Sequence, residues 1–206
     1  MKTHDFLVET GSEELPPKAL KHLSLAFTEG IINRLVKAGL DHGEVESFAT
    51  PRRLAVRVRQ LASAQPDQSI VRRGPALHAA FDPAGKPTKA CEGFARSCGT
   101  TPNQLATLET EKGAWLVFRS SQPGKTAQQL LPEFVEQSLA ELPIPKRMRW
   151  GASHVEFVRP VHWVVMLLDE QVIHTEILGL ATGNTTRGHR FHHPGEITID
   201  SPATYS

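Results

Sequence analysis

The chain has 206 residues, 39% of them hydrophobic, and its 23 Lys and Arg against 22 Asp and Glu give a formal net charge of +1. A chain of this length can bury a core without metals or disulfides, so collagen-like, disulfide-rich and disordered proteins are excluded. No apolar run approaches the roughly 18 residues of a membrane span, and the first ten residues lack a secretory signal, so we expect a cytoplasmic protein with no membrane contact.

The first elements along the chain are predicted to be a short strand and a long helix. Asp5–Glu9 has the pattern of a strand, and Pro16 and Pro17 favour the start of a helix. An apolar stripe predicts that this helix continues to Gly39, which can take the left-handed conformation that ends helices. The stripe consists of Leu20, Leu23, Phe27, Ile31 and Leu35.

The next segment, Val45–Leu61, is predicted to form two strands that are broken at Thr50–Pro51. In the second strand, one set of positions is apolar and the other mostly basic, which predicts a sheet with one solvent-exposed, basic face. The apolar set is Leu54, Val56 and Val58, and the other set is Ala55, Arg57 and Arg59. Residues 62–87 are rich in turn formers, so they are expected to be mostly loop with a short strand at Ile70–Val71.

A short helix and a strand are predicted in the middle of the chain. Thr88 is a suitable cap for a helix that carries Cys91 and Cys98, whose spacing places them about 10.5 Å apart. That distance is too long for a disulfide, so both cysteines are expected to be reduced. Ala114–Arg119 then has the pattern of a strand.

The last third of the chain is predicted to be rich in strands. Thr126–Leu142 first shows a helical pattern, in which Pro132 causes a kink or marks the true start. Asp169–Glu170 is a suitable tight turn between two later strands. The strand patterns are Val155–Phe157, Val161–Leu168, Val172–Leu178, a stretch ending at Arg187–Phe191, and Glu196–Ile199.

Strands and helices are mixed without regular alternation, which favours an α+β fold with mixed, largely antiparallel sheets packed against a few helices. We expect two subdomains. The first is an amino-terminal α+β region at residues 1–145. The second is a β-rich region at residues 146–206, which continues into residues absent from this chain.

The densest basic cluster lies in Pro143–Gly151 (PIPKRMRWG). Lys146, Arg147 and Arg149 could neutralise phosphates while Trp150 stacks on a base, a pairing typical of contacts with single-stranded RNA. The alternative interpretation is a solvated basic loop with a packed tryptophan.

A second segment, Thr185–Pro194, combines arginines with histidines at positions 189, 192 and 193. The histidines suggest a metal site, but neither cysteine has a ligand-like spacing and no His-Glu-x-x-His motif occurs, so a zinc site is not favoured. Arg187, His189 and Arg190 are expected to hydrogen-bond an RNA or partner backbone, or to hold a turn together.

A third candidate is the pair Arg52 and Arg53, which follows a proline at a strand entrance. Arginine can bind a phosphate with two parallel hydrogen bonds, or it can pair with nearby acids. Glu13 and Glu14 are candidate partners, and we interpret them as capping groups because they precede a helix start. Residues 51–99 hold nine basic and three acidic side chains, so an anionic partner is expected to meet this quarter first.

Catalytic templates are missing from the sequence. It contains no Gly-x-x-x-x-Gly-Lys-Ser/Thr loop, no Gly-x-Gly-x-x-Gly, no Gly-x-Ser-x-Gly elbow and no zinc framework. The residue patterns alone therefore indicate a cytoplasmic α+β protein with basic surfaces.

Six particular strings occur in order along the chain: Val8–Pro17 (VETGSEELPP), Phe48–Leu54 (FATPRRL), Glu92–Arg96 (EGFAR), Pro143–Gly151 (PIPKRMRWG), Phe157–Trp163 (FVRPVHW) and Thr186–Phe191 (TRGHRF). Together they resemble the β subunit of bacterial heterotetrameric glycyl-tRNA synthetase. The family's chains are much longer, so the resemblance implies an amino-terminal portion.

The resemblance implies a division of labour in the ATP-dependent attachment of glycine to tRNA. The α subunit holds the class II core that activates glycine with ATP and Mg²⁺, whereas the β subunit supplies tRNA contacts. The implied partners are the α subunit, tRNA(Gly) and the remaining β-subunit domains. No family catalytic residue maps onto this stretch, so these residues alone are expected to be catalytically inactive and to bind no cofactor.

Within this framework, the candidate RNA-binding residues would position tRNA by their charge, with one tryptophan as a stacking platform. They are Arg52, Arg53, Lys146, Arg147, Arg149, Trp150, Arg187 and Arg190. The alternative is a purely structural interface module with no direct RNA contact, in which the same residues face the α subunit or later β-subunit domains.

Overall fold

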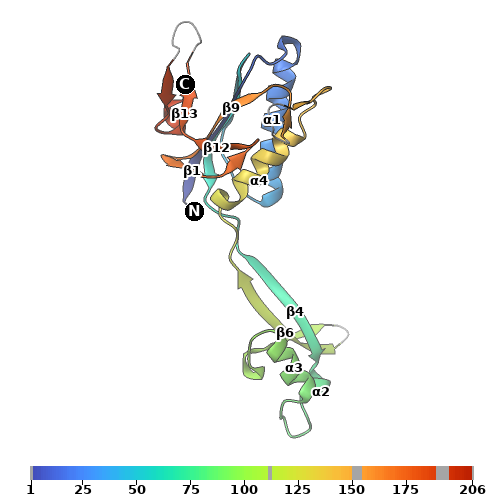
Figure 1. Cartoon of the computed structure of the whole chain (residues 1–206). Coiled ribbons are helices and arrows are strands. Elements are labelled where there is room, and N and C mark those ends of the chain that lie inside the picture. The colour runs from blue at the N-terminus through green and yellow to red at the C-terminus, as the bar shows by residue number, and fades with distance from the viewer. Residues whose placement is uncertain (1, 111–112, 150–154, 189–194, 206) are drawn as a thin grey trace. The chain divides into compact units, whose positions relative to one another are not determined.

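The computed structural model describes residues 2–110, 113–149, 155–188 and 195–205, and the chain divides into two compact units (Figure 1). The body comprises residues 1–65 and 125–206, and the inserted unit comprises residues 66–124. Helices and antiparallel strands occur in both, which confirms the predicted α+β class. The division differs from the expected boundary at residue 145, because the helix before that position and the strands after it share one core.

The body is built around a seven-stranded sheet in the order β11-β12-β9-β1-β3-β2, with β10 paired to β9. All neighbouring strands are antiparallel except β12 and β9. The predicted break at Thr50–Pro51 and the predicted turn at Asp169–Glu170 are confirmed, whereas the expected strand Val172–Leu178 is divided between two short strands. The bounds are β1 Thr3–Ser12, β2 Val45–Thr50, β3 Arg53–Ala62, β9 Val161–Leu168, β10 Gln171–Val172, β11 Glu176–Ile177 and β12 Leu180–Gly183.

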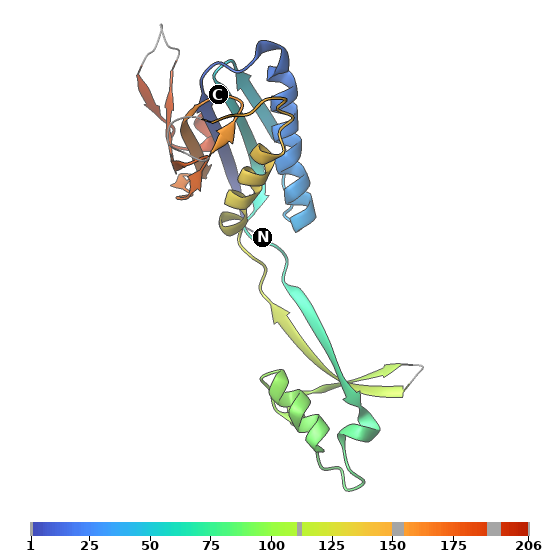
Figure 2. The ribbon, with the colours of Figure 1, turned by 45° about the vertical axis from the view of Figure 1, so that its right-hand side comes forward.

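Two helices, α1 (Pro17–Ala38) and α4 (Ala127–Ala140), lie side by side on one face of this sheet (Figure 2). As predicted, α1 ends at Gly39, which has a φ of 69°. The side chain of Thr126 caps α4, so Pro132 lies inside this helix and does not mark its start. The core between helices and sheet includes Phe6, Val8, Leu23, Phe27, Ile31, Leu35, Val56, Leu131 and Val135.

The opposite face of the sheet is covered by the last residues of the described chain. The prediction of a solvent-exposed, basic face on β3 is therefore wrong, and Arg57 is only 3% exposed. Its guanidinium donates to both carboxylate oxygens of Glu46 on β2, at 2.7 and 2.9 Å, and to the carbonyl of Pro202 at 3.0 Å. The apolar residues packed on this face are Leu7, Val165, Leu167, Ile199 and Tyr205.

Two short strand pairs complete the body. β7 (Met148–Arg149) pairs with β8 (Glu156–Phe157), and β13 (Thr185–Arg187) pairs with β14 (Glu196–Thr198). A single 3-10 turn, η2, follows at Pro202–Thr204. Within the described ranges, no helix is long and apolar enough to cross a membrane.

The inserted unit contains a three-stranded antiparallel sheet in the order β4-β6-β5, together with two helices and a 3-10 turn. The prediction that residues 62–87 are mostly loop is wrong, because a long strand and a short helix occupy this stretch. Thr88 caps the following helix by accepting a hydrogen bond from the backbone N–H of Cys91, and neither cysteine forms a disulfide. The bounds are β4 Gln68–Ala76, α2 Leu77–Ala80, α3 Lys89–Ser97, η1 Pro102–Gln104, β5 Ala106–Thr110 and β6 Gly113–Gln122.

Candidate functional site

The body contains a carboxylate with no exposed surface, that of Glu9 near the end of β1. Strand alternation places it with Leu7 on the sheet face away from the helices. The indole N–H of Trp163 donates to Glu9 Oε1 at 2.6 Å, and the hydroxyls of Thr186 and Tyr205 donate to its two oxygens. We call this group the Glu9 network. Because a buried charge is tolerated only when it is hydrogen-bonded and paired, these donors explain how the carboxylate can lie there.

The donors of the Glu9 network come from β9, from β13 and from the residue after η2, and the sequence makes room for the tryptophan. Gly11 faces Trp163 across the β1–β9 pair, and a Cβ built on Gly11 would lie 1.9 Å from the indole ring. Only a residue without a side chain therefore lets this tryptophan reach the carboxylate. The ring of Tyr205 packs edge-on against Phe48 at 5.1 Å. Burial and the neighbouring Glu9 charge raise the pKa of Tyr205, so its phenol stays protonated and donates.

Two of the predicted RNA-binding residues meet at this network. Arg53 places Nη1 3.5 Å from Glu9 Oε2 and donates from Nη2 to the backbone carbonyl of Arg187 at 2.5 Å. The guanidinium of Arg187 lies 5.8 Å from the ring centre of Trp163 and 3.8 Å from the carboxylate of Glu196. The Arg53 side chain is 24% exposed and that of Arg187 is 55% exposed. Arg53 is therefore an internal contact, and Arg187 presents its charge to solvent.

Arg52 contacts the loop that follows β1. Its Nε donates to the carbonyl of Ser12 at 3.3 Å, and its Nη2 lies 3.9 Å from the carboxylate of Glu13, which is also 2.9 Å from Nε2 of His162. Both arginines thus contact nearby acids, Arg52 the predicted partner Glu13 and Arg53 the unpredicted Glu9. The capping interpretation of Glu13 and Glu14 is wrong, because no side chain caps α1 by a hydrogen bond.

The third group of predicted residues follows α4. Arg147 donates to the carbonyl of Ala140, the last residue of α4. The charge of Arg147 is therefore used to satisfy a carbonyl at the carboxyl end of that helix. Arg149 pairs with Glu156 at 2.8 Å but remains 56% exposed, and Lys146 is exposed. Trp150 and Arg190, together with the histidines at 189, 192 and 193, lie outside the described residues.

One arginine that the sequence analysis did not select joins these groups. Arg159 donates from Nε to the carbonyl of Glu14 at 3.0 Å, and its Nη1 lies 3.1 Å from the sulfur of Met148. It therefore holds the basic segment after α4 against the loop that follows β1. The sequence signal that could have identified it is its position in FVRPVHW, in the short connection between β8 and β9.

Glu9 was also missed as a candidate. The signal was its position in Asp5–Glu9, where a charged residue shares a strand face with an apolar one. A lone charge in a buried strand indicates a specific partner, but the sequence cannot name partners that are far away along the chain.

Among the described candidate residues, Lys146 and Arg149 are exposed after α4, and Arg187 is exposed on β13. Exposed ion pairs contribute little to stability, so a phosphate can replace the carboxylate partner of either arginine at small cost. Among the described residues, no group of three or more His, Cys, Asp or Glu side chains could hold a metal ion. Through their positive charge, the exposed cations can attract an anion.

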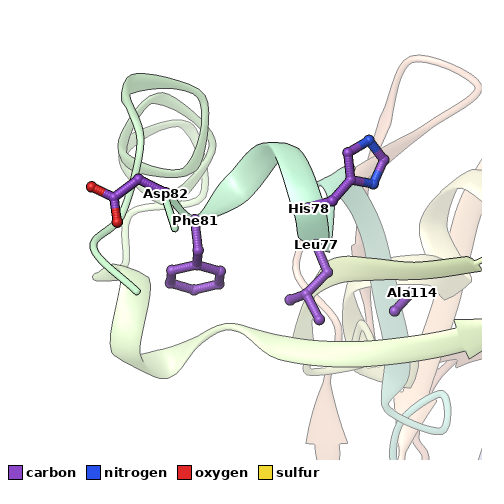
Figure 3. A pocket seen from close by; sticks show the side chains of 5 residues that line it. All are labelled: Leu77, His78, Phe81, Asp82 and Ala114. Carbon is purple, nitrogen blue, oxygen red and sulfur yellow. The ribbon is translucent and has the colours of Figure 1, made fainter. Parts of the chain in front are cut away.

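The inserted unit contains a pocket of about 570 Å³, lined by Leu77, His78, Phe81, Asp82 and Ala114. Figure 3 shows that the side chains of His78 and Asp82 point away from one another, whereas Leu77 and Phe81 point to the same side. In a ligand site, a few polar groups normally point toward the same place, whereas the two polar side chains of this pocket do not. We therefore place the candidate site in the body.

Comparisons with known proteins show which family this chain is similar to. A family model described as "Glycyl-tRNA synthetase beta subunit" matches residues 6–206. Curated relatives described as "Glycine--tRNA ligase beta subunit" are 65% identical in Hahella chejuensis, 61% in Marinobacter nauticus and 53% in Escherichia coli, each over 205 residues. Each alignment covers 100% of this chain and 30% of the relative. The chain thus spans less than a third of the length of these proteins.

Proposed function

Because this chain belongs to the glycyl-tRNA synthetase beta subunit family, we propose that it serves the attachment of glycine to tRNA as the amino-terminal region of that subunit. In this proposal the region binds and positions tRNA and contributes to assembly with an alpha subunit. Glycine activation with ATP and Mg²⁺ belongs to that alpha partner. The work of this region is orientation of a reactant, which raises a rate without chemistry of its own.

The observation that supports this role is the separation of the candidate cations into internal and outward-facing groups. Arg52, Arg53 and Arg147 are engaged by backbone carbonyls or by acids of the body. Lys146 and Arg149 are more exposed, on the segment that Arg159 holds in place, and Arg149 pairs there with the exposed Glu156. Internal contacts of this kind fix the outward cations on a folded surface, which lowers the entropy cost of binding an anionic partner.

The test uses the assembled enzyme with the double variant Lys146→Glu and Arg149→Glu. We expect the KM for tRNA to rise roughly tenfold or more, because two charge-assisted contacts become repulsive. Glycine-dependent ATP–pyrophosphate exchange, which needs no tRNA, should keep its rate. The matched control is Lys18→Glu with Lys21→Glu, which makes the same charge change at exposed positions of α1.

An unchanged KM for tRNA would contradict the assignment of these cations. Loss of co-purification with the alpha subunit in the double variant would instead favour the interface alternative. Met148 gives that alternative some support, since this apolar side chain is 39% exposed between the two arginines of the segment.

A further inference from the structure

The inserted unit has one sheet face that its helices do not cover. Gly74 of β4 lies beneath the ring of Phe94 on α3, and Leu116 of β6 packs with Ala80 and Cys91, so α2 and α3 occupy one side of the sheet. Strand alternation directs the side chains of neighbouring positions to the other side. We call this side the Trp115 face, and it carries Val71, Arg73, Leu108, Trp115, Val117 and Arg119.

An arginine and a tryptophan are stacked at the centre of this face. The guanidinium of Arg73 lies 3.6 Å from the ring centre of Trp115, which is van der Waals contact. Val117, directly opposite Arg73 on the neighbouring strand, is fully buried. The indole N–H of Trp115 is buried and has no hydrogen-bond partner among the described residues. Such a group is costly unless a ligand or a water satisfies it.

The charge of the Trp115 face is positive. Arg119 is exposed and stands opposite Val71, which is itself 53% exposed, so the two arginines are diagonal neighbours across β4 and β6. Glu109 faces Ala114 in the register and therefore belongs to the helix side. The other described acids of the unit lie in loops or on α3, outside the paired positions of β4, β5 and β6: Asp67, Asp82 and Glu92.

We infer that the Trp115 face binds a single-stranded segment of RNA, with Arg73 and Trp115 as a stacking platform for a base and Arg119 as a phosphate contact. The inference rests on the proposed function, which supplies RNA as the anionic partner. A planar guanidinium held on an indole offers a surface on which a base can stack, and this is a means by which proteins recognise unpaired nucleotides. An acidic protein segment would need the cations but not the planar stack.

The experiment measures binding of a fluorescein-labelled, non-self-complementary RNA of roughly 12 nucleotides to the 206-residue chain by fluorescence anisotropy. Trp115→Leu is expected to weaken binding by about fivefold or more. Arg119→Gln should weaken it as well and should lower the slope of log Kd against log salt by about 0.7, the value for one phosphate contact with a single strand. The matched control is Arg96→Gln on α3, which removes one exposed cation from the helix side.

Thermal unfolding of each variant shows whether the unit remains folded, and Trp115→Phe provides a conservative variant that keeps an aromatic platform and should restore most of the affinity. Equal weakening by Arg96→Gln and Arg119→Gln would overturn the inference, because it would indicate unspecific attraction. No RNA binding by the unchanged chain, or tighter binding of poly-glutamate at the same face, would overturn it too.

The outcome separates this inference from the proposed function. If Lys146→Glu with Arg149→Glu abolishes binding of the oligonucleotide while the Trp115 face variants leave it unchanged, the body site stands and this inference fails. If only the Trp115 face variants weaken binding, this inference stands and the assignment of RNA contacts to the body fails.

Discussion

Glu9 connects four elements through one carboxylate, so its contribution is best tested by removing it. Truncation in Glu9→Ala leaves the indole of Trp163 and two hydroxyls without an acceptor and leaves Arg53 without its charge partner. We expect the free energy of unfolding to fall by about 3–5 kcal/mol, as for other broken buried pairs. Urea denaturation measures the change.

Glu14→Ala is the control for this prediction, because the side chain of Glu14 is exposed and a surface substitution should stay within about 0.5 kcal/mol. If Glu9→Ala were as stable as the unchanged chain, the network would not hold these elements together.

The pair Glu46 and Arg57 makes a prediction about acid stability. The hydrogen bond from Arg57 lowers the pKa of Glu46 from 4.5 to about 2. The folded state therefore favours the charged carboxylate, and this stabilisation is complete above pH 4.5 and is lost as the pH falls toward 2. In Glu46→Gln the free energy of unfolding should depend less on pH across that range. Urea titrations at several pH values check this, with Glu29→Gln on α1 as the control for loss of one carboxylate.

A steeper acid dependence in Glu46→Gln than in the unchanged chain would contradict this account. Asp169 acts in the same direction: burial opposes its charge, but hydrogen bonds from His4 and from the backbone N–H of Asp5 outweigh it and lower its pKa.

The site residues show what a sequence can reveal at this scale. Arg52 and Arg53 were found because adjacent arginines after a proline are visible in the sequence itself. Glu9 was not, because its donors lie 154, 177 and 196 residues further along the chain. The exposure of Arg57 was misjudged for the same reason, since the segment that covers it comes at the far end of the sequence.

Among the elements, α1 was predictable because its signals are local: a proline start, an apolar stripe and Gly39 at the end. The strand β4 was underestimated because many of its side chains are exposed and Gly74 and Pro75 resemble a turn. It forms because β6 supplies its hydrogen-bond partners from Trp115 to Gln122, and pairing over such a distance has no local signature. The parallel pairing of β12 with β9 was not predicted either, because it too has no local signature in the sequence.

The pairing of β1 with β9 makes a prediction about Gly11. Gly11→Ala would place a methyl group 1.9 Å from the ring of Trp163, so the indole must move away from Glu9. We expect a loss of about 1–3 kcal/mol from overpacking, together with a change in tryptophan fluorescence. Gly183→Ala on β12 is a matched control, because its Cβ would meet no atom within 4 Å. Equal effects of the two substitutions would show that backbone freedom matters here rather than the space for the indole.

On the scale of the whole molecule, the two units depend on different cores. The body core draws on residues before 66 and after 124, and no described residue of the inserted unit contributes to it. The chain also closes at the junction, because Ala64 bridges to Thr126 and the N–H of Gln65 donates to the carbonyl of Lys125 at 2.9 Å. The body thus has a ready connection between β3 and α4 without the insertion.

Replacing residues 66–124 with a short glycine-rich turn should therefore leave a folded body that unfolds in one cooperative transition. The denaturant m-value should fall, because less surface is exposed on unfolding, while the midpoint changes little. Removal of residues 185–198 is the contrasting deletion: although shorter, it takes Thr186 from the Glu9 network and should destabilise the body strongly. If the longer deletion unfolded the body and the shorter one did not, the body core would depend on the insertion after all. Circular dichroism with urea titration distinguishes these results.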